Sequence, residues 1–197
     1  MIIKKKLYFN FKKMERIIVL KGEKVALVVP EREDSVLWYK FINDIENQIF
    51  LNQRGRLASL EAEYEYYDNL KNRNDKKMLS IMILESKKII GSISLFDISE
   101  KNNNAVLGVL LGDKQEQNKG FGTETISLML KYGFEVLGLH KIKLEALETN
   151  SRAIRVYEKC GFKEYGRAKE EHFDGDKYFD TVCMEILRKD YFSSLDN

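Results

Sequence analysis

Gln117-Asn118-Lys119-Gly120-Phe121-Gly122-Thr123 joins an apolar run at residues 105–111 to a helical pattern that extends from about residue 120 to residue 137. A strand followed by a glycine-rich turn and a helix start is typical of an anion-binding site. Glycines let backbone N–H groups approach a ligand without interference from a Cβ atom. The unpaired N–H groups of the first helical turn and the positive end of the helix dipole then favour phosphate. We therefore expect a phosphate-bearing cofactor near residue 120.

The spacing of the glycines narrows the choice of cofactor. A dinucleotide fingerprint requires G-x-G-x-x-G, but Thr125 stands at the third position, although Glu145 lies at about the distance of the expected acidic residue. A P-loop requires Gly-Lys-Ser/Thr, and no lysine separates Gly122 from Thr123. The pattern that remains is Q-x-x-G-x-G.

A second motif lies about 30 residues downstream, after a stretch at 141–147 that alternates polar and apolar residues like a half-buried strand. The helix that follows can be capped by Asn150 or Thr149 and closed by Gly161 in the left-handed conformation. Asn150 and Tyr157 are seven residues apart, so two helical turns place them on about the same face.

The two motifs together resemble those of the GCN5-related N-acetyltransferases (GNAT), which are acyltransferases that use acetyl-CoA. The second motif has the form N-x-x-A-x-x-x-Y-x-x-x-G-F, with Ala153, Tyr157, Gly161 and Phe162 in register. The resemblance covers roughly residues 14–187. Gly133-Phe134, Leu139-His140-Lys141 and the acidic turn within 173–180 favour the branch of ribosomal-protein N-terminal acetyltransferases and spermidine N-acetyltransferases.

This resemblance implies an α/β (α+β) fold with a mixed, mostly antiparallel central sheet of about seven strands flanked by about four helices. We expect a basic extension at residues 1–13, a single acetyltransferase domain at 14–190 and a C-terminal tail at 191–197. Hydrophobic periodicity predicts strands at 16–20, 24–29 and 105–111, the last covered on both faces, and hairpins at 77–84/88–97 and 164–173/178–187. It predicts helices from Asp34 or Ser35, as the cap, to about 42 and from Ser59 to about 69.

The resemblance also implies where acetyl-CoA, as a co-substrate, is held. The central strand is expected to splay from its neighbour near Val109, Leu110 and Leu111, whose backbone groups would pair with the pantetheine arm. An N–H there, assigned to Leu111, would polarise the thioester carbonyl. Tyr157 would protonate the departing thiolate while the amine attacks directly. Asn150 would contact the cofactor or cap its helix. The cofactor-binding residues are predicted as Val109, Leu110, Leu111, Gln117, Asn118, Lys119, Gly120, Phe121, Gly122, Thr123, Asn150 and Tyr157.

The general base is left open by the sequence. Related enzymes often use a carboxylate on the central strand, but residues 105–111 contain none. Glu145, His172 and Asp174 are the candidates. Cys160 raises the alternative of a covalent acetyl-enzyme, although its place beside the end of a helix favours a small buried hydrophobe.

Composition indicates one cytoplasmic enzyme domain. No apolar run approaches the length that spans a membrane, no secretory leader is recognisable, and Cys160 and Cys183 form no C-x-x-C pair. The first 13 residues carry five lysines and no acid; because the whole chain carries +2, the remainder carries −3. The body has no basic stripe, so neither nucleic acid nor a membrane is expected as a partner. We expect no metal, and a homodimer is a candidate assembly.

Acidic residues gather at 61–68 and 170–180. They form either a solvated face or, if they line the cleft, a surface that attracts a cationic amine.

Three functions fit these observations. The first is N-acetylation of a primary amine: a protein N-terminus, a polyamine or another small amine such as an amino sugar or aminoglycoside. The second is a catalytically silent acyl-CoA-binding sensor or partner-binding module. The absence of a carboxylate from the central strand favours this second function. The third, a nucleotide-binding protein of another fold, would make the motif at 150–162 a coincidence.

Overall fold

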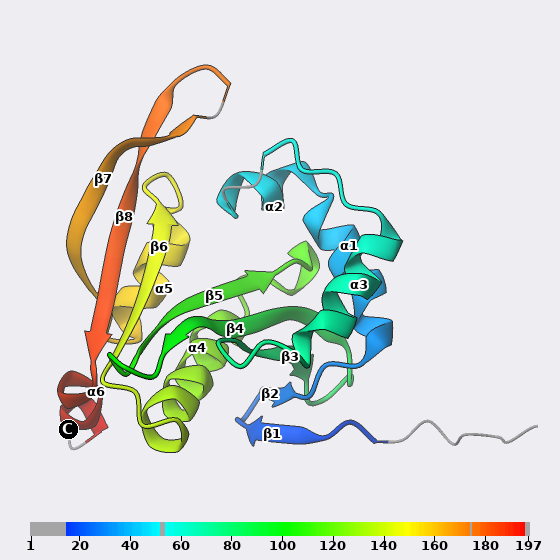
Figure 1. Cartoon of the computed structure of the whole chain (residues 1–197), viewed down its shortest axis with the longest axis horizontal. Coiled ribbons are helices and arrows are strands. Elements are labelled where there is room, and N and C mark those ends of the chain that lie inside the picture. The colour runs from blue at the N-terminus through cyan, green and yellow to red at the C-terminus, as the bar shows by residue number, and fades with distance from the viewer. Residues whose placement is uncertain (1–14, 52–53, 174, 196–197) are drawn as a thin grey trace, which may run out of the picture.

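The computed structural model describes residues 15–51, 54–173 and 175–195, and they form an eight-stranded sheet with helices on both faces (Figure 1). The strand order is β1-β2-β3-β4-β5-β6-β8-β7. All neighbouring strands are antiparallel except β5 and β6. The α/β fold with a mostly antiparallel sheet is confirmed. The described residues hold eight strands and six α-helices rather than about seven and four.

The strands lie close to the predicted ranges. They are β1 (Ile18–Lys21), β2 (Val25–Val28), β3 (Lys77–Ile83), β4 (Ile89–Ser99), β5 (Asn104–Leu111), β6 (Lys141–Leu147), β7 (Lys163–Phe173) and β8 (Tyr178–Leu187). The α-helices are α1 (Ser35–Ile42), α2 (Ile45–Phe50), α3 (Leu60–Leu70), α4 (Phe121–Lys131), α5 (Ser151–Lys159) and α6 (Arg188–Leu195). A π-helical turn, Tyr132–Val136, continues α4. The helix predicted from about residue 120 to residue 137 is therefore present, but its last part is π-helical.

The main core lies between the sheet and α4. Ile126, Met129 and Leu130 of α4 pack with Leu95 of β4 and Ile142 of β6, and all five are almost completely buried. The opposite face carries α1 and α3, where Trp38 packs edge-on against Tyr66 with their ring centroids 6.2 Å apart. The sheet therefore separates two layers of helices, and the long β7–β8 hairpin extends beyond them (Figure 1).

Strand β5 is covered on only one face, which corrects the prediction for residues 105–111. Ala105 and Leu107 are buried toward α4, whereas Val106, Gly108 and Leu110 on the opposite face are only partly buried. The sequence does not show that the two faces of β5 differ in burial, because the side chains on the open face are apolar too.

Asp34 anchors the chain before β1 rather than capping α1. Arg16 donates two hydrogen bonds of 2.7 and 2.5 Å to its carboxylate, and the hydroxyl of Ser80 donates a third of 2.6 Å. No N–H of α1 bonds the Asp34 side chain. Asp34, one of the two predicted caps, therefore stands at the N-cap position of α1, and the helix begins where expected, but the Asp34 side chain makes no capping hydrogen bond to α1. In contrast, Ser59 accepts a hydrogen bond of 3.1 Å from the N–H of Ala62 and caps α3, which begins beside the predicted position.

The two chain ends differ in what can be described. The basic extension predicted at 1–13 lies outside the described residues. At the other end, residues treated as a tail are helical to Leu195, and the ring of Tyr191 packs on Phe134 with centroids 5.0 Å apart. In the part of the chain that is described, no helix is both long and apolar enough to cross a bilayer, and no group of three His, Cys, Asp or Glu side chains is placed to hold a metal ion.

Candidate active site

The site begins where two central strands part. β5 pairs with β6 only from Asn104↔Lys141 to Val106↔Lys143. Beyond that point β5 stays paired with β4 as far as Leu111, while β6 stays paired with β8 as far as Leu147. The two strands therefore diverge (Figure 1), and the second half of β5 has backbone groups on its β6 side without a strand partner. The predicted splay is confirmed in position.

A cavity of about 550 Å³ lies at this split. It is bounded by the end of β5, the loop before α4, the start of α5 and one side of α2. All but one of the predicted cofactor-binding residues line it: Val109, Leu110, Leu111, Gln117, Asn118, Gly120, Phe121, Gly122, Thr123, Asn150 and Tyr157. The exception is Lys119, whose ammonium instead forms an ion pair of 2.7 Å with Glu116.

The loop before α4 is shaped by two left-handed residues. Asn118 has a φ of 63° and Gly120, at the N-cap of α4, has a φ of 85°. Both lie in the region that favours glycine or asparagine. The residues of the first turn of α4, from Phe121 to Thr123, line the cavity, and a helix N-terminus favours an anion. A phosphate group therefore fits here.

Glu124 fixes the start of α4 against the turn between β1 and β2. Its carboxylate accepts hydrogen bonds from the N–H groups of Glu23 and Lys24, the latter at 3.1 Å. A Cβ atom at Gly22 would lie 2.0 Å from Oε1 of Glu124, so a side chain at position 22 would require the Glu124 carboxylate to move. The N-terminus of α4 is thus held in place by a residue of its first turn.

Helix α5 closes the other side of the cavity. Oδ1 of Asn150 accepts a hydrogen bond of 3.2 Å from the N–H of Ala153, so Asn150 caps the helix, one of the two roles considered for it. Gly161 ends the helix segment with a φ of 93°, as predicted. Tyr157 is 9% exposed and packs edge-on against Phe162 with centroids 6.0 Å apart.

Burial determines the protonation state of Tyr157. Loss of solvent, with a smaller effect of Cys160, raises the pKa of Tyr157 to about 12. The phenol is therefore a neutral proton donor at physiological pH, and its hydroxyl has no hydrogen-bond partner among the described residues. Burial also raises the pKa of the Cys160 thiol, which donates to the carbonyl of Thr123 at 3.6 Å. A protonated, engaged thiol is a poor nucleophile.

The three candidates for the general base are placed differently. His172 is 3% exposed, with an Nε2 that has no hydrogen-bond partner, and it does not line the cavity. Asp174 lies outside the described residues. Glu145 does not line the cavity either; it is exposed on β6, on the face opposite Ile142 and Leu144 and hence away from the core.

Helix α2 is the part of the site that the sequence did not predict. Glu46, Asn47, Phe50 and Leu51 line the cavity opposite the strands. The local signal is Asp44, whose carboxylate accepts hydrogen bonds from the N–H groups of Glu46 and Asn47 at 3.0 and 3.2 Å. An aspartate immediately before a helical segment is an N-cap signature, but six residues are too few to show helical periodicity.

Comparison with known proteins agrees with this architecture. A model of the acetyltransferase (GNAT) domain matches residues 24–163. The spermidine N(1)-acetyltransferase of Vibrio cholerae is 31% identical over 160 residues, which are 78% of this chain and 90% of that protein. The putative ribosomal N-acetyltransferase YdaF of Bacillus subtilis is 27% identical over 109 residues, which are 55% of this chain and 59% of that protein.

Solved structures give the same result. The crystal structure of spermidine N-acetyltransferase from Vibrio cholerae in complex with CoA and spermine superposes with a TM-score of 0.81 at 27% identity, covering 87% of this chain and 99% of the other. The fold and the split-strand cavity define an acyltransferase of the CoA-dependent class. The chain belongs to the GNAT acetyltransferase family. It is an acetyl-CoA-dependent N-acetyltransferase that acts on an amine.

Proposed function

We propose that this protein acetylates the primary amine of a small molecule or peptide by direct attack within the cavity between β5 and β6. The observation that carries the proposal is the convergence of both motifs on one cavity, which is lined by Tyr157 and by the start of α4. Because one cavity can hold both reactants together, proximity supplies much of the rate.

Backbone groups hold the cofactor in this proposal. The first N–H groups of α4, presented by Gly120 and Gly122, bind the pyrophosphate. The unpaired edge of β5 at Val109–Leu111 binds the pantetheine arm as an added strand would. Bound acetyl-CoA supplies the acetyl group as a thioester. The N–H of Leu111 polarises the carbonyl of that group, since a fixed donor in a dry site stabilises developing negative charge.

Tyr157 is the proposed general acid. It donates its proton to the departing sulfur. The raised pKa of Tyr157 suits this role in one respect, because the phenol keeps its proton at every physiological pH. A pKa of about 12 makes the phenol a weaker acid than an exposed tyrosine. The same loss of solvent acts on a thiolate in this cavity and raises its basicity too, so proton transfer between the two remains matched.

Glu145 is the proposed general base. It is the candidate that is exposed among the described residues. It lies two residues beyond Lys143, the last residue of β6 that pairs with β5, on the face of the sheet that also carries Gly108. A carboxylate there can accept the proton of an incoming ammonium, directly or through water. In this proposal β6 supplies the general base, because β5 has no carboxylate.

The identity of the acceptor amine and the oligomeric state of the protein are further parts of the proposal. The spermidine N-acetyltransferase of Vibrio cholerae has a crystal structure in complex with CoA and spermine, and it also has a dodecameric structure. A polyamine is therefore the first acceptor with which others are to be compared, and a homodimer stays a prediction alongside larger assemblies.

The experiment is thiol release from acetyl-CoA with a panel of polyamines, amino sugars, aminoglycosides, amino acids and short peptides. Release that depends on one amine class, with the acetylated amine identified by mass spectrometry, supports the proposal. Binding of CoA without release by any amine would instead support the silent acyl-CoA sensor.

A further inference from the structure

Arg152 is a basic residue of the cavity whose charge is not matched by the carboxylate of a described residue. Of the described residues that line the cavity, Lys114 and Arg152 are basic. Lys114 is committed to the α2 wall, because its ammonium lies 2.9 Å from Oδ2 of Asp44 and 2.8 Å from Oε2 of Glu46. The guanidinium of Arg152 instead donates its hydrogen bond of 2.6 Å to a neutral amide, that of Gln117. Arg152 therefore brings a positive charge that a ligand can neutralise.

The bond to Gln117 holds the guanidinium between the starts of two helices. Arg152 lies in the first turn of α5, whereas Gln117 lies in the loop before α4. The N-terminus of each helix carries a positive partial charge, which adds to that of the guanidinium. A guanidinium presents several N–H donors in one plane, so the donors that Gln117 does not use can bind a phosphate in pairs. A phosphate between α4 and α5 would therefore be stabilised from both helices.

A second cation reaches the start of α4 from the turn between β1 and β2. The ammonium of Lys24 donates a hydrogen bond of 3.4 Å to the carbonyl of Lys119 and lies 3.6 Å from the position of a Cβ atom at Gly120. Glu124 places Lys24 there, because its carboxylate accepts a hydrogen bond of 3.1 Å from the Lys24 N–H. Lys24 thus adds a positive charge beside the N–H groups that are proposed to bind the pyrophosphate.

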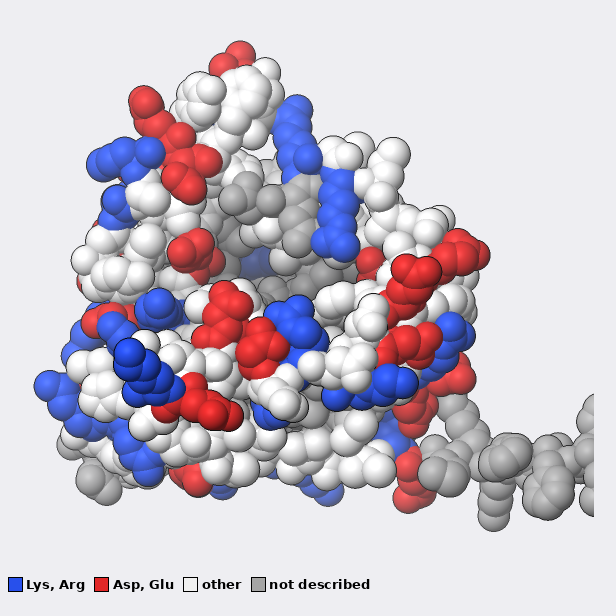
Figure 2. Space-filling model, viewed as in Figure 1, with Lys and Arg blue, Asp and Glu red and all other residues white. Residues whose placement is uncertain are grey.

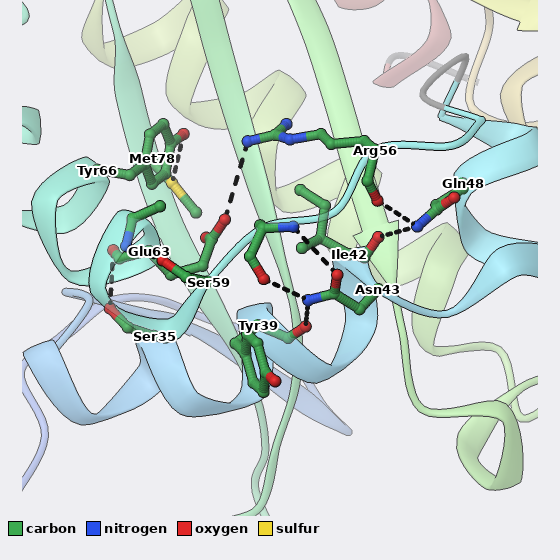
Figure 3. A network of polar contacts seen from close by, with 12 residues as sticks. Ser35, Tyr39, Ile42, Asn43, Gln48, Arg56, Ser59, Glu63, Tyr66 and Met78 are labelled. Carbon is green, nitrogen blue, oxygen red and sulfur yellow. Dashed lines mark hydrogen bonds and ion pairs between the residues drawn. The ribbon is translucent and has the colours of Figure 1, made fainter.

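The charges on the α2 side of the cavity are paired with one another. Glu46, the acidic residue that α2 contributes to the cavity, is neutralised by Lys114. On the segment that follows α2, Nη2 of Arg56 lies 3.8 Å from Oε1 of Glu63, whose side chain is 3% exposed (Figure 3). Glu63 is therefore not part of the solvated acidic face considered for residues 61–68, and none of these described residues lines the cavity. The α2 side neither attracts nor repels a phosphate strongly.

The rest of the surface gives little general attraction for a ligand with several phosphates. Residues 14–197 carry a net charge of −3, because the whole chain carries +2 and the first 13 residues carry +5. Figure 2 shows Lys and Arg side chains interspersed with Asp and Glu side chains over much of the face that it displays. Binding of such a ligand therefore depends on the local cations at α4 and α5 rather than on the field of the whole body.

The two cations are expected to bind different phosphates. Lys24 adjoins Gly120, where the first N–H groups of α4 are proposed to hold the pyrophosphate. Arg152 is held at Gln117, before the left-handed turn and on the side of α5. In CoA the 3′-phosphate lies on the ribose, on the far side of the pyrophosphate from the thiol. It is therefore the phosphate that remains for Arg152.

We propose that Arg152 binds the 3′-phosphate of CoA, so that the protein selects acetyl-CoA over donors that carry the acetyl group on phosphopantetheine alone. The inference rests on the proposed placement of the cofactor in the acetyl transfer and specifies its donor. A phosphopantetheine arm on a carrier protein has the thioester but lacks the nucleotide, and it would gain nothing from Arg152. Arg152 is then a specificity-determining residue for the acyl donor.

The test removes the phosphates of the ligand in steps. CoA, 3′-dephospho-CoA, phosphopantetheine and pantetheine are titrated into the whole protein by calorimetry, so the readout is binding and not turnover. Loss of the 3′-phosphate is expected to weaken binding by about 10- to 100-fold, because a charge-assisted contact is lost. The ratio of the affinities for CoA and 3′-dephospho-CoA is the quantity that variants should change, since a general effect on the loop acts on both ligands.

Variants assign each phosphate to its residue. Arg152→Ala should bring this ratio close to one, and so should Arg152→Gln, which keeps a donor for Gln117 but removes the charge. Lys24→Ala should weaken both ligands by the same factor and leave the ratio unchanged. Arg155→Ala, at an exposed position on α5 outside the cavity, and Lys21→Ala, at an exposed position on β1, are the matched controls and should bind all four ligands normally.

Two outcomes would overturn the inference alone: equal affinities of the unmodified protein for CoA and 3′-dephospho-CoA, or an unchanged ratio in both Arg152 variants. The expected ratios in a protein that releases no thiol with any amine would support this inference and overturn the proposed acetyl transfer. A protein that binds none of the four ligands would overturn both.

Discussion

Nη1 of Arg152 donates a hydrogen bond of 2.6 Å to Oε1 of Gln117, so the first turn of α5 is joined to the loop that precedes α4. Both residues line the cavity. The contact links two residues that are 35 positions apart in the chain, one from each motif. It holds the entrance of the cavity together before any ligand arrives, which lowers the cost of ordering the loop on binding.

The conformation of Gly120 should matter for CoA beyond its effect on stability. Gly120 and Gly138 both have a positive φ, of 85° and 69°, and nothing lies within 4 Å of a Cβ atom at Gly138. Replacing either by alanine is expected to cost about 1–2 kcal/mol of folding free energy. Calorimetry should show CoA affinity about tenfold or more weaker only in Gly120→Ala. Equal affinities in the two variants would show that the loop does not bind the cofactor.

Removal of the Tyr157 hydroxyl should slow chemistry and spare binding. Tyr157→Phe is expected to lower kcat by about 10²- to 10⁴-fold, the usual contribution of a general acid, with CoA affinity unchanged. Tyr39→Phe, at an exposed position on α1, is the control and should keep full activity. A Tyr157→Phe variant with normal kcat would remove the tyrosine from the mechanism.

Two tyrosines should titrate far above the rest. Burial raises the pKa of Tyr157 to about 12, and burial with the hydrogen bond to Glu135 raises that of Tyr191 to about 12. Each raised pKa stabilises the fold below pH 10, the ordinary tyrosine value, and this contribution is lost as pH rises from about 10 to 12. Absorbance titration of tyrosinate should lose one of the two latest steps in Tyr157→Phe. Loss of an early step instead would contradict the buried, neutral state.

Glu145→Gln should produce a defect that depends on pH. Without the base, only acceptor molecules that are already deprotonated can attack, so kcat/KM near neutral pH should fall by about 10²-fold or more. The defect should shrink toward alkaline pH, because a free amine loses its proton near pH 10. Glu171→Gln, at an exposed position on β7, provides the comparison. A pH–rate profile parallel to that of the unmodified protein would exclude Glu145 as the base.

Breaking the pair of Arg16 and Asp34 should destabilise the whole domain. Their side chains are 14% and 2% exposed, so removing Arg16 leaves a buried carboxylate without its strongest partner. Denaturant unfolding of Arg16→Ala should show a loss of about 3–5 kcal/mol. Arg73→Ala breaks an exposed pair of similar geometry with Asp75 and should change stability little. Equal effects of the two substitutions would contradict the anchoring role.

Local features made most of the fold and half of the site predictable. The glycine turn at 117–123 and the capped helix from Asn150 can be recognised within a few residues, because caps and left-handed turns require particular side chains. Both lead to the same cavity. The acidic residue Glu63 could not be interpreted in the same way, since its burial depends on α3 packing against a segment that carries Arg56.

Non-local contacts account for what was missed. The sequence around Asp34 is typical of a helix cap. Only the folded chain shows that Arg16, 18 residues earlier, donates hydrogen bonds to the Asp34 carboxylate. Helix α2 has six residues, too few for a period, and its place in the cavity wall follows from the tertiary arrangement. The open face of β5 depends on which helices cover the sheet, which an apolar run does not encode.

A structure of the protein with CoA bound tests the central claim most directly. The account predicts the pyrophosphate at the N-terminus of α4, the pantetheine arm paired with the backbone at Val109–Leu111, and the sulfur within hydrogen-bond distance of the Tyr157 hydroxyl. CoA bound elsewhere, or a sulfur directed away from Tyr157, would contradict it.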